Sequence, residues 1–273
     1  MLWQKESSNK GCFYIHWGYN REYFTRSTIH FRGPDYDLTF YNLAAHDRPS
    51  KFSADTYFNP VNISIPQYVF RGGYFVTDRV HISFGIDHLK YVMDANQQAV
   101  VSGVVAPAVS SKYAGSYLHD TLTISPDLLR FEHTNGLNLV TLNVDYLQPC
   151  VNIYKHKVWL KWNMGLGGCF VITKTDVALF DDRTDNEFHL SGYSIAAHTG
   201  PRIEFWKWGY IGFEVKGGYM NLPDVPIHNE QPKRANHQFG FFEYYGLVGF
   251  QIPIPEVVRV LKGLRDNKRK TKI

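Results

Sequence analysis

Residues 202–220 read RIEFWKWGYIGFEVKGGYM, and this stretch decides the fold class. Side chains on a β-strand alternate between the two faces of a sheet, so two arms separated by Trp206-Lys207-Trp208-Gly209 form a hairpin with unlike faces. One face carries Ile203, Phe205, Ile211, Phe213 and Val215, and the other carries Arg202, Glu204, Gly212, Glu214, Lys216 and Gly218. The hairpin fits either a soluble sheet packed on a core or a transmembrane barrel whose apolar face meets lipid.

The same alternation recurs along the chain, and the connections between the alternating stretches sort by length. The expected strands cover residues 11–20, 67–76, 80–93, 137–147, 158–172, 188–205, 209–220 and 238–252. Tight turns follow Val76, Cys150 and Phe205, whereas long connections follow Asn20, Met93, Ile172 and Met220. Short turns at one rim and long loops at the other are typical of outer-membrane barrels. We therefore predict an all-β fold, an antiparallel up-and-down transmembrane β-barrel of about eight strands with long extracellular loops.

Composition narrows the function classes. Aromatic residues make up 16% of the chain, which suits aromatic girdles at membrane interfaces. No apolar run reaches about 18 residues, so no transmembrane helix is expected. The net charge is only +4, with the basic excess at residues 262–272, so we predict no nucleic-acid partner. Cys12, Cys150 and Cys169 show no metal-binding spacing.

The chain is expected to contain a barrel with its extracellular loops at residues 1–254 and a basic periplasmic tail with a short helix at residues 255–273. The first residues, MLWQKESSNKG, lack the basic and apolar regions of a signal peptide. An outer-membrane location therefore requires a signal that this sequence does not show.

Charged and polar side chains on the inward face predict a filled lumen. A barrel of about eight strands has an interior just wide enough for side chains. Buried ions persist when they are paired, so we expect a salt-bridge network that plugs the barrel, and the mixed signs argue against an ion pore. The expected inward set is His16, Arg71, His81, Asp87, Asp145, Lys161, Arg202, Glu204, Glu214 and Lys216.

A second group of polar residues is expected at the long-loop rim. One predicted strand ends with Asp87-His88-Leu89-Lys90-Tyr91, and FEHTNGLN at residues 131–138 enters the next, so the two segments meet. Acid–base catalysis needs a histidine oriented by a third polar group. The candidate catalytic residues are His133, Glu132, Thr134, Asn135 and His88. Residues two positions apart lie on the same face of a strand, so His133 is expected beside Asn135, and Glu132 beside Thr134. The alternatives to catalysis at this rim are loop solvation, contact with lipopolysaccharide or a divalent cation, and a metal site. No cofactor is predicted, and a divalent cation at the extracellular rim stays open.

Two resemblances bear on these alternatives. EHTNGLN resembles the His-x-Ser-Asn-Gly motif of outer-membrane phospholipase A and the related motif of lipid A deacylases, with Thr134 where the nucleophilic serine would stand. More broadly, HWGYNR, DRPSKF, IPQYVFRGGYF, GIDHLKYVM, FEHTNGLN and VKGGYMNLPD resemble an outer-membrane barrel family of Bacteroidota. The first resemblance implies a lipid acyl hydrolase. The second implies an outer-membrane location and a barrel fold.

The leading hypothesis is an integral outer-membrane barrel with a plugged lumen. Its extracellular loops are expected to bind partner proteins or lipopolysaccharide. One form of this hypothesis makes the protein an accessory subunit of a larger outer-membrane or transport assembly. The first alternative is an outer-leaflet lipid hydrolase that uses His133. The second is a soluble β-barrel carrier, which predicts an open, apolar lumen.

Overall fold

The computed structural model describes residues 8–59, 61–62, 65–155, 157–206, 208–228 and 233–254. Among these residues, eight antiparallel strands form a closed ring in the order β1–β5–β6–β9–β10–β13–β14–β15, and β15 pairs back onto β1. The ring strands are β1 (Cys12–Phe24), β5 (Tyr68–Phe75), β6 (Val80–Met93), β9 (Leu129–Tyr154), β10 (Val158–Thr173), β13 (His189–Phe205), β14 (Gly209–Pro226) and β15 (Arg234–Pro253). The predicted all-β barrel is confirmed.

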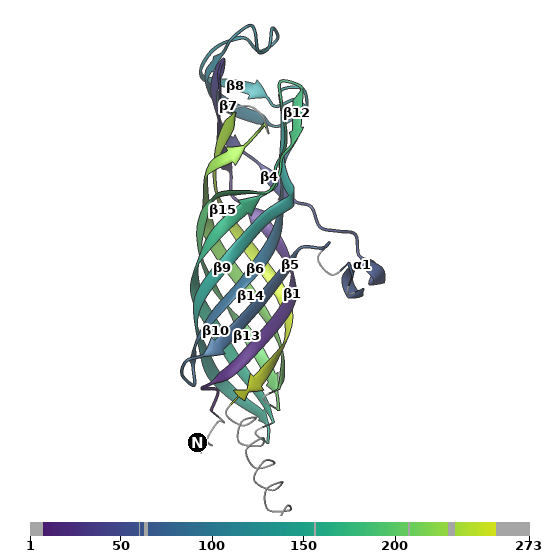
Figure 1. The fold of residues 1–273 in the computed structure, drawn as a ribbon, viewed down its shortest axis with the longest axis vertical. Coiled ribbons are helices and arrows are strands. Elements are labelled where there is room, and N and C mark those ends of the chain that lie inside the picture. The colour runs from purple at the N-terminus through teal and green to yellow at the C-terminus, as the bar shows by residue number, and fades with distance from the viewer. Residues whose placement is uncertain are drawn as a thin grey trace, which may run out of the picture.

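The ring closes between the first and last strands, so both ends of the barrel chain lie at one rim. Cys12 pairs with Pro253 and Phe24 pairs with Phe241. Figure 1 shows this rim beside the label N, with the long connections at the opposite end. The short turn between β5 and β6 lies at the same rim, where Val76 N donates to Val80 O at 3.0 Å.

The polarity of the two faces of the barrel wall is the reverse of that in a water-soluble barrel. Outward side chains are apolar and exposed, as at Leu142, Val144, Val248 and Phe250, whereas polar inward side chains are buried. An apolar exterior around a polar interior is stable in a lipid bilayer, because water would leave the apolar band unburied. We call this outward band the membrane belt; on β9 it runs over residues 140–146, and on β15 over residues 242–252. Within the described residues, no helix is both long and apolar enough to cross a bilayer.

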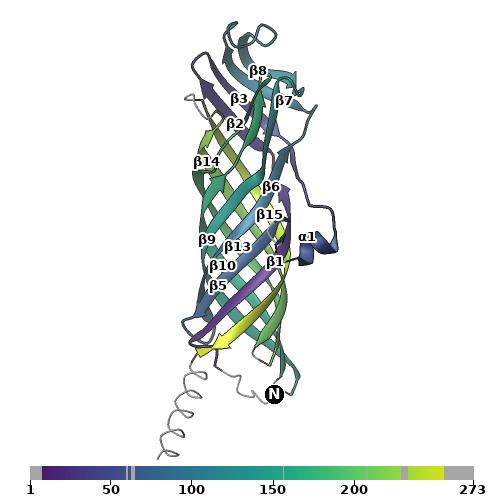
Figure 2. The same cartoon turned by 45° about the vertical axis from the view of Figure 1, so that its right-hand side comes forward.

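The barrel wall continues beyond the membrane belt into an extension with its own apolar core. It is built from the upper ends of β6, β9, β14 and β15 together with β2 (Ser27–Gly33), β3 (Tyr36–Leu43), β4 (Ala45–Asp47), β7 (Gln98–Val105), β8 (Gly115–Thr123), β11 (Asp176–Leu179) and β12 (Asp182–Asp185). Its buried core includes Ile29, Phe31, Phe40, Tyr91, Phe131 and Phe239. Figures 1 and 2 show the extension at the end opposite the label N, and the short helix α1 (Ala54–Phe58) beside the barrel.

Several predicted boundaries were wrong. The long connection expected after Met93 contains the strands β7 and β8, and the long connection expected after Ile172 contains β11 and β12. β7 and β11 bury side chains in a small core formed by distant segments, whereas β8 and β12 are mostly exposed, so none of the four has the strict alternation of the membrane belt. The turn expected after Cys150 lies after Tyr154, because β9 passes through Pro149 with a shift in its register to β10. The predicted tail at residues 255–273 lies outside the described residues.

Candidate functional site

The interior of the membrane belt holds the ten side chains of the predicted inward set. His16 is half-buried, and the other nine are buried: Arg71, His81, Asp87, Asp145, Lys161, Arg202, Glu204, Glu214 and Lys216. They point inward because each lies at an even spacing from its inward neighbours on the same strand. We call this group with its polar neighbours the charge ladder. It has three levels along the barrel.

Asp87 is the centre of the level nearest the extension. Its carboxylate pairs with Arg71 Nη1 at 2.5 Å and also with the ammonium group of Lys216. The same Lys216 Nζ lies 3.3 Å from Glu243 Oε2. Glu243 was missed in the sequence, although its spacing from Tyr245 and Leu247 places it on the inward face of β15. Two cations and two anions therefore alternate at this level.

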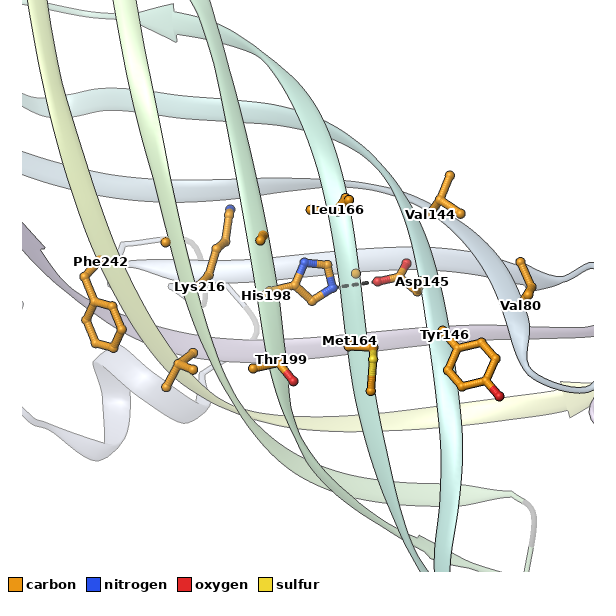
Figure 3. A pocket seen from close by; sticks show the side chains of 14 residues that line it. Val80, Val144, Asp145, Tyr146, Met164, Leu166, His198, Thr199, Lys216 and Phe242 are labelled. Carbon is orange, nitrogen blue, oxygen red and sulfur yellow. Dashed lines mark hydrogen bonds and ion pairs between the residues drawn. The ribbon is translucent and has the colours of Figure 1, made fainter.

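Histidines and a carboxylate occupy the middle level. His198 Nε2 lies 2.6 Å from Asp145 Oδ1, across β10, as Figure 3 shows. Gly165 on β10 makes room for this contact, because a Cβ there would lie 2.2 Å from Asp145 Oδ1. Glu214 accepts hydrogen bonds from Asn163 Nδ2 at 3.0 Å and from Tyr245 at 2.6 Å. The middle level is therefore held by neutral hydrogen-bonding groups as well as by charge.

Arg202 organises the level nearest the short turns. Its Nη2 lies 2.7 Å from Glu204 Oε1, and Lys161 Nζ lies 2.7 Å from Glu204 Oε2. Its guanidinium group also lies over the Tyr210 ring, 3.4 Å from the centroid, a cation–π contact. A cavity lined by side chains such as His81, Arg202 and Tyr210 has a volume of about 20 Å³, room for about one water molecule.

The outer surface at the same height is a shallow apolar groove. It has a volume of about 600 Å³ and is lined by side chains such as Met164, Leu166 and Phe242 around the small residues Ala197 and Gly217. Figure 3 shows these side chains on the barrel wall that carries the His198–Asp145 contact. The groove belongs to the membrane belt and therefore faces lipid.

His133 points into the apolar core of the extension. It is fully buried, its Nδ1 lies 3.0 Å from the Thr175 hydroxyl, and its Nε2 lies 3.3 Å from His237 Nδ1. The two imidazoles stack with centroids 5.5 Å apart. Both lie beyond the membrane belt, and burial among aromatic rings lowers the pKa of His133 to about 3 and that of His237 well below its usual value.

The other candidate catalytic residues lie elsewhere. Glu132 Oε2 pairs with Arg48 at 2.5 Å, Thr134 donates to Glu132 Oε1 at 3.1 Å, and Asn135 is exposed. His88 contacts Asn138 at 2.8 Å. The expected pairing of His133 with Asn135 on one face is wrong, because the register between β6 and β9 shifts between Leu89 and Tyr91 and breaks the alternation. The structure therefore does not bring His133 and Thr134 into hydrogen-bond contact.

A metal site and an open carrier lumen were the two remaining alternatives. Among the described residues, no three His, Cys, Asp or Glu side chains are grouped closely enough to hold a metal by themselves. The soluble carrier required an open, apolar lumen, and this expectation is wrong, because the interior is packed with paired charges.

Comparisons with known proteins find similar solved structures but no family. No family model and no curated protein matches the chain. Among solved structures, the chain is similar to the outer membrane protein OprG from Pseudomonas aeruginosa (TM-score 0.42, 9% identity, 91% of this chain and 99% of that chain). It is also similar to Ail, the attachment invasion locus protein of Yersinia pestis (TM-score 0.32, 12% identity, 89% of this chain and 99% of that chain). The closed ring of eight strands, with an apolar outer belt and a polar interior, is the fold of an integral outer-membrane β-barrel.

Proposed function

We propose that this barrel is a non-conducting membrane anchor that carries a rigid extracellular extension for binding partner proteins. The observation that supports it best is the set of buried, paired charges inside the barrel. The charge ladder lies inside the membrane belt, and the apolar core of the extension lies beyond it. A hydrated ion would have to break buried ion pairs and then cross an apolar core, and both steps are strongly unfavourable.

Single-channel recording in planar lipid bilayers tests the closed lumen. The purified full-length protein is expected to insert without conductance steps at ±100 mV in about 1 M KCl, conditions that screen charges without opening a packed interior. A variant with Arg71→Ser, Asp87→Ser and Lys216→Ser removes the upper ion-pair level and serves as the comparison. Regular conductance steps from the unmodified protein would contradict the proposal.

The edge of the extension sheet supports partner binding. β8 is the last strand of the sheet path and pairs only with β7 among the described strands. Its side chains are mostly exposed, and Leu118 is 86% exposed. An exposed strand edge offers unpaired backbone groups to an added strand of another protein. A partner is therefore expected to add a strand beside β8.

Photo-crosslinking in native membranes tests this edge. A crosslinking amino acid at Leu118 is expected to capture one protein in stoichiometric amount, whereas the same group at Leu142, on the membrane belt, should capture only lipid. Co-purification of that protein with the unmodified barrel is the second measurement. An isolated monomer with no crosslink at either position would remove partner binding from the proposal.

Lipopolysaccharide is a second candidate ligand, favoured by a hollow on the outside of the extension. The hollow has a volume of about 270 Å³ and is lined by Arg48, Arg130 and Arg183 together with Glu132 and Asp176. Arg48 and Arg183 pair with these carboxylates, whereas Arg130 is exposed and forms no ion pair within the described residues. Arginine binds phosphate in a fixed two-pronged geometry.

Thermal unfolding with added lipopolysaccharide tests this site. Phosphorylated lipopolysaccharide is expected to raise the unfolding temperature, and Arg130→Ala should reduce the shift. Dephosphorylated lipopolysaccharide serves as the ligand control. An equal shift with and without phosphate, or in the variant, would contradict a phosphate-binding role for Arg130.

A further inference from the structure

A cluster of buried oxygen atoms lies at the boundary between the charge ladder and the extension. Asn20 and Glu22 point inward from β1, Gln67 precedes β5, and Asp47 ends β4. β5 begins only at Tyr68, so β4 takes its place beside β6 at this height. Four segments that are distant in sequence thus bring carboxylate and amide groups to one place.

The contacts inside the cluster leave several oxygen atoms free. The amide nitrogen of Gln67 donates to both Glu22 Oε2 and Asp47 Oδ1, so the two carboxylates converge on one amide. Asn20 Nδ2 donates to Glu243 Oε1 at 2.7 Å. Within the described part of the chain, Glu22 Oε1, Gln67 Oε1 and Asn20 Oδ1 have no hydrogen-bond partner, although these three residues are 2–3% exposed. Buried polar atoms without partners cost free energy, so such a group calls for a ligand.

The charge balance at this height is negative. Glu22 lies directly opposite Glu243 in the β1–β15 register, an arrangement that is unfavourable for like charges. Lys216 compensates Glu243 and also pairs with Asp87. Within the described residues, no basic side chain forms an ion pair with Glu22, and Asp47 pairs only with the partly exposed Arg21 at 3.9 Å. Half-buried Lys90 interacts electrostatically with both carboxylates, but its ammonium group donates to Ser50 and to the Ile65 carbonyl instead. The two carboxylates therefore share no buried ion pair, and a divalent cation would balance them.

We propose that a divalent cation of the calcium class binds between Glu22, Asp47, Gln67 and Asn20. Calcium prefers six to eight oxygen ligands, including carboxylates, amide carbonyls and water. If the side-chain amide of Gln67 flips, its Oε1 takes the position of Nε2 between the carboxylates of Glu22 and Asp47. The Asp47 side chain is 11% exposed and provides the route from the outside. The cation would tie β4 to β1 and β5, and the inference does not depend on partner binding.

Equilibrium dialysis of the purified full-length protein in detergent, after treatment with EDTA, tests the site. CaCl₂ is expected to bind with one ion per chain and to raise the unfolding temperature, and MgCl₂ is the competing probe. Glu22→Gln and Asp47→Asn each remove one ligand charge and should weaken calcium binding at least tenfold. Asp37→Asn removes an exposed carboxylate of the extension and should leave calcium binding unchanged.

The outcomes separate the cation from a shared proton. If Glu22 and Asp47 share a proton instead, the unmodified protein binds no stoichiometric calcium or magnesium, and the proposal is overturned. Retained calcium affinity in Glu22→Gln or Asp47→Asn would overturn it as well. A shift in gel mobility on boiling shows that each variant is folded, and Asp47→Asn, at the partly exposed position, is the second variant in case Glu22→Gln does not fold.

Discussion

Asp87 is the residue on which the upper level of the charge ladder depends most. It contacts both Arg71 and Lys216 and is fully buried. Replacing Asp87 by Asn removes the negative charge and leaves two buried cations side by side. We expect Asp87→Asn to lower the free energy of unfolding by about 3–5 kcal/mol, the usual cost of breaking a buried pair on one side.

Urea unfolding in lipid vesicles, followed by tryptophan fluorescence, measures the Asp87 effect. The matched control is Asp37→Asn, whose carboxylate is 61% exposed and pairs with His30 at the surface. That control should cost less than about 1 kcal/mol, because exposed ion pairs contribute little. Equal losses in the two variants would show that the Asp87 pairs do not stabilise the barrel.

The His133–His237 pair makes the extension sensitive to acid. Burial lowers the pKa of His133 in the folded state to about 3, so the unfolded chain binds the proton more readily. The stabilisation that depends on the neutral ring is complete above the unfolded pKa and is lost as pH falls from about 6.5 towards 3. For His133 the loss is about 2 kcal/mol at pH 5, and His237 adds to it in the same direction.

Hydrogen exchange, corrected for the intrinsic rate at each pH, measures this acid effect. Amides of β2 and β15 in the extension should lose protection between pH 7.5 and pH 5. The double variant His133→Phe and His237→Phe should reduce the loss, whereas His119→Gln, at an exposed position of β8, should not. Protection that is independent of pH in the unmodified protein would refute the prediction.

At the scale of single strands, adjacent glycines on β14 have opposite roles. A Cβ at Gly218 would lie 2.6 Å from the backbone oxygen of Ile195 and 2.8 Å from Ala196 Cβ, inside the barrel. A Cβ at Gly217, on the membrane belt, would meet nothing closer than Phe241 O at 3.9 Å. We expect Gly218→Ala to cost about 1–3 kcal/mol through overpacking, and Gly217→Ala to change stability by less than about 0.5 kcal/mol.

The temperature at which the gel mobility shifts compares these two variants directly. Gly217→Ala is the control for the loss of glycine itself, because both positions lie in one strand. A larger effect at Gly217 than at Gly218 would mean that the strand presents the opposite face to the lumen.

The strands of the extension show why element prediction succeeded in the membrane belt and failed above it. In the belt, lipid on one side and a polar interior on the other impose strict alternation, as on β15 from Phe242 to Ile252. β8 has neither boundary, since it lies at a sheet edge with both faces mostly exposed. Its sequence therefore lacks the period-two signal, and only its pairing with β7 makes it a strand.

For the whole molecule, the closed ring predicts unusual resistance to detergent. Every ring strand pairs on both sides, so unfolding must break a continuous ladder of hydrogen bonds. The native gene product should fractionate with the outer membrane and change its gel mobility on boiling in detergent. A boiled sample of the same preparation is the control. Recovery in the soluble fraction without detergent would contradict a lipid-facing belt.

The properties that depend on local alternation could be predicted before the fold was known. The barrel class, the apolar belt and the inward direction of residues such as Lys161 and Glu214 follow from period two, because lipid and lumen constrain alternate side chains independently of their partners. The contacts between these groups became visible only in the folded chain. The register of separate strands places Lys216 between Asp87 and Glu243, encloses His133 with His237, and gathers Glu22, Asp47 and Gln67. Such contacts depend on pairing between strands that are distant in sequence, as far apart as Cys12 and Pro253, and no local pattern encodes that pairing.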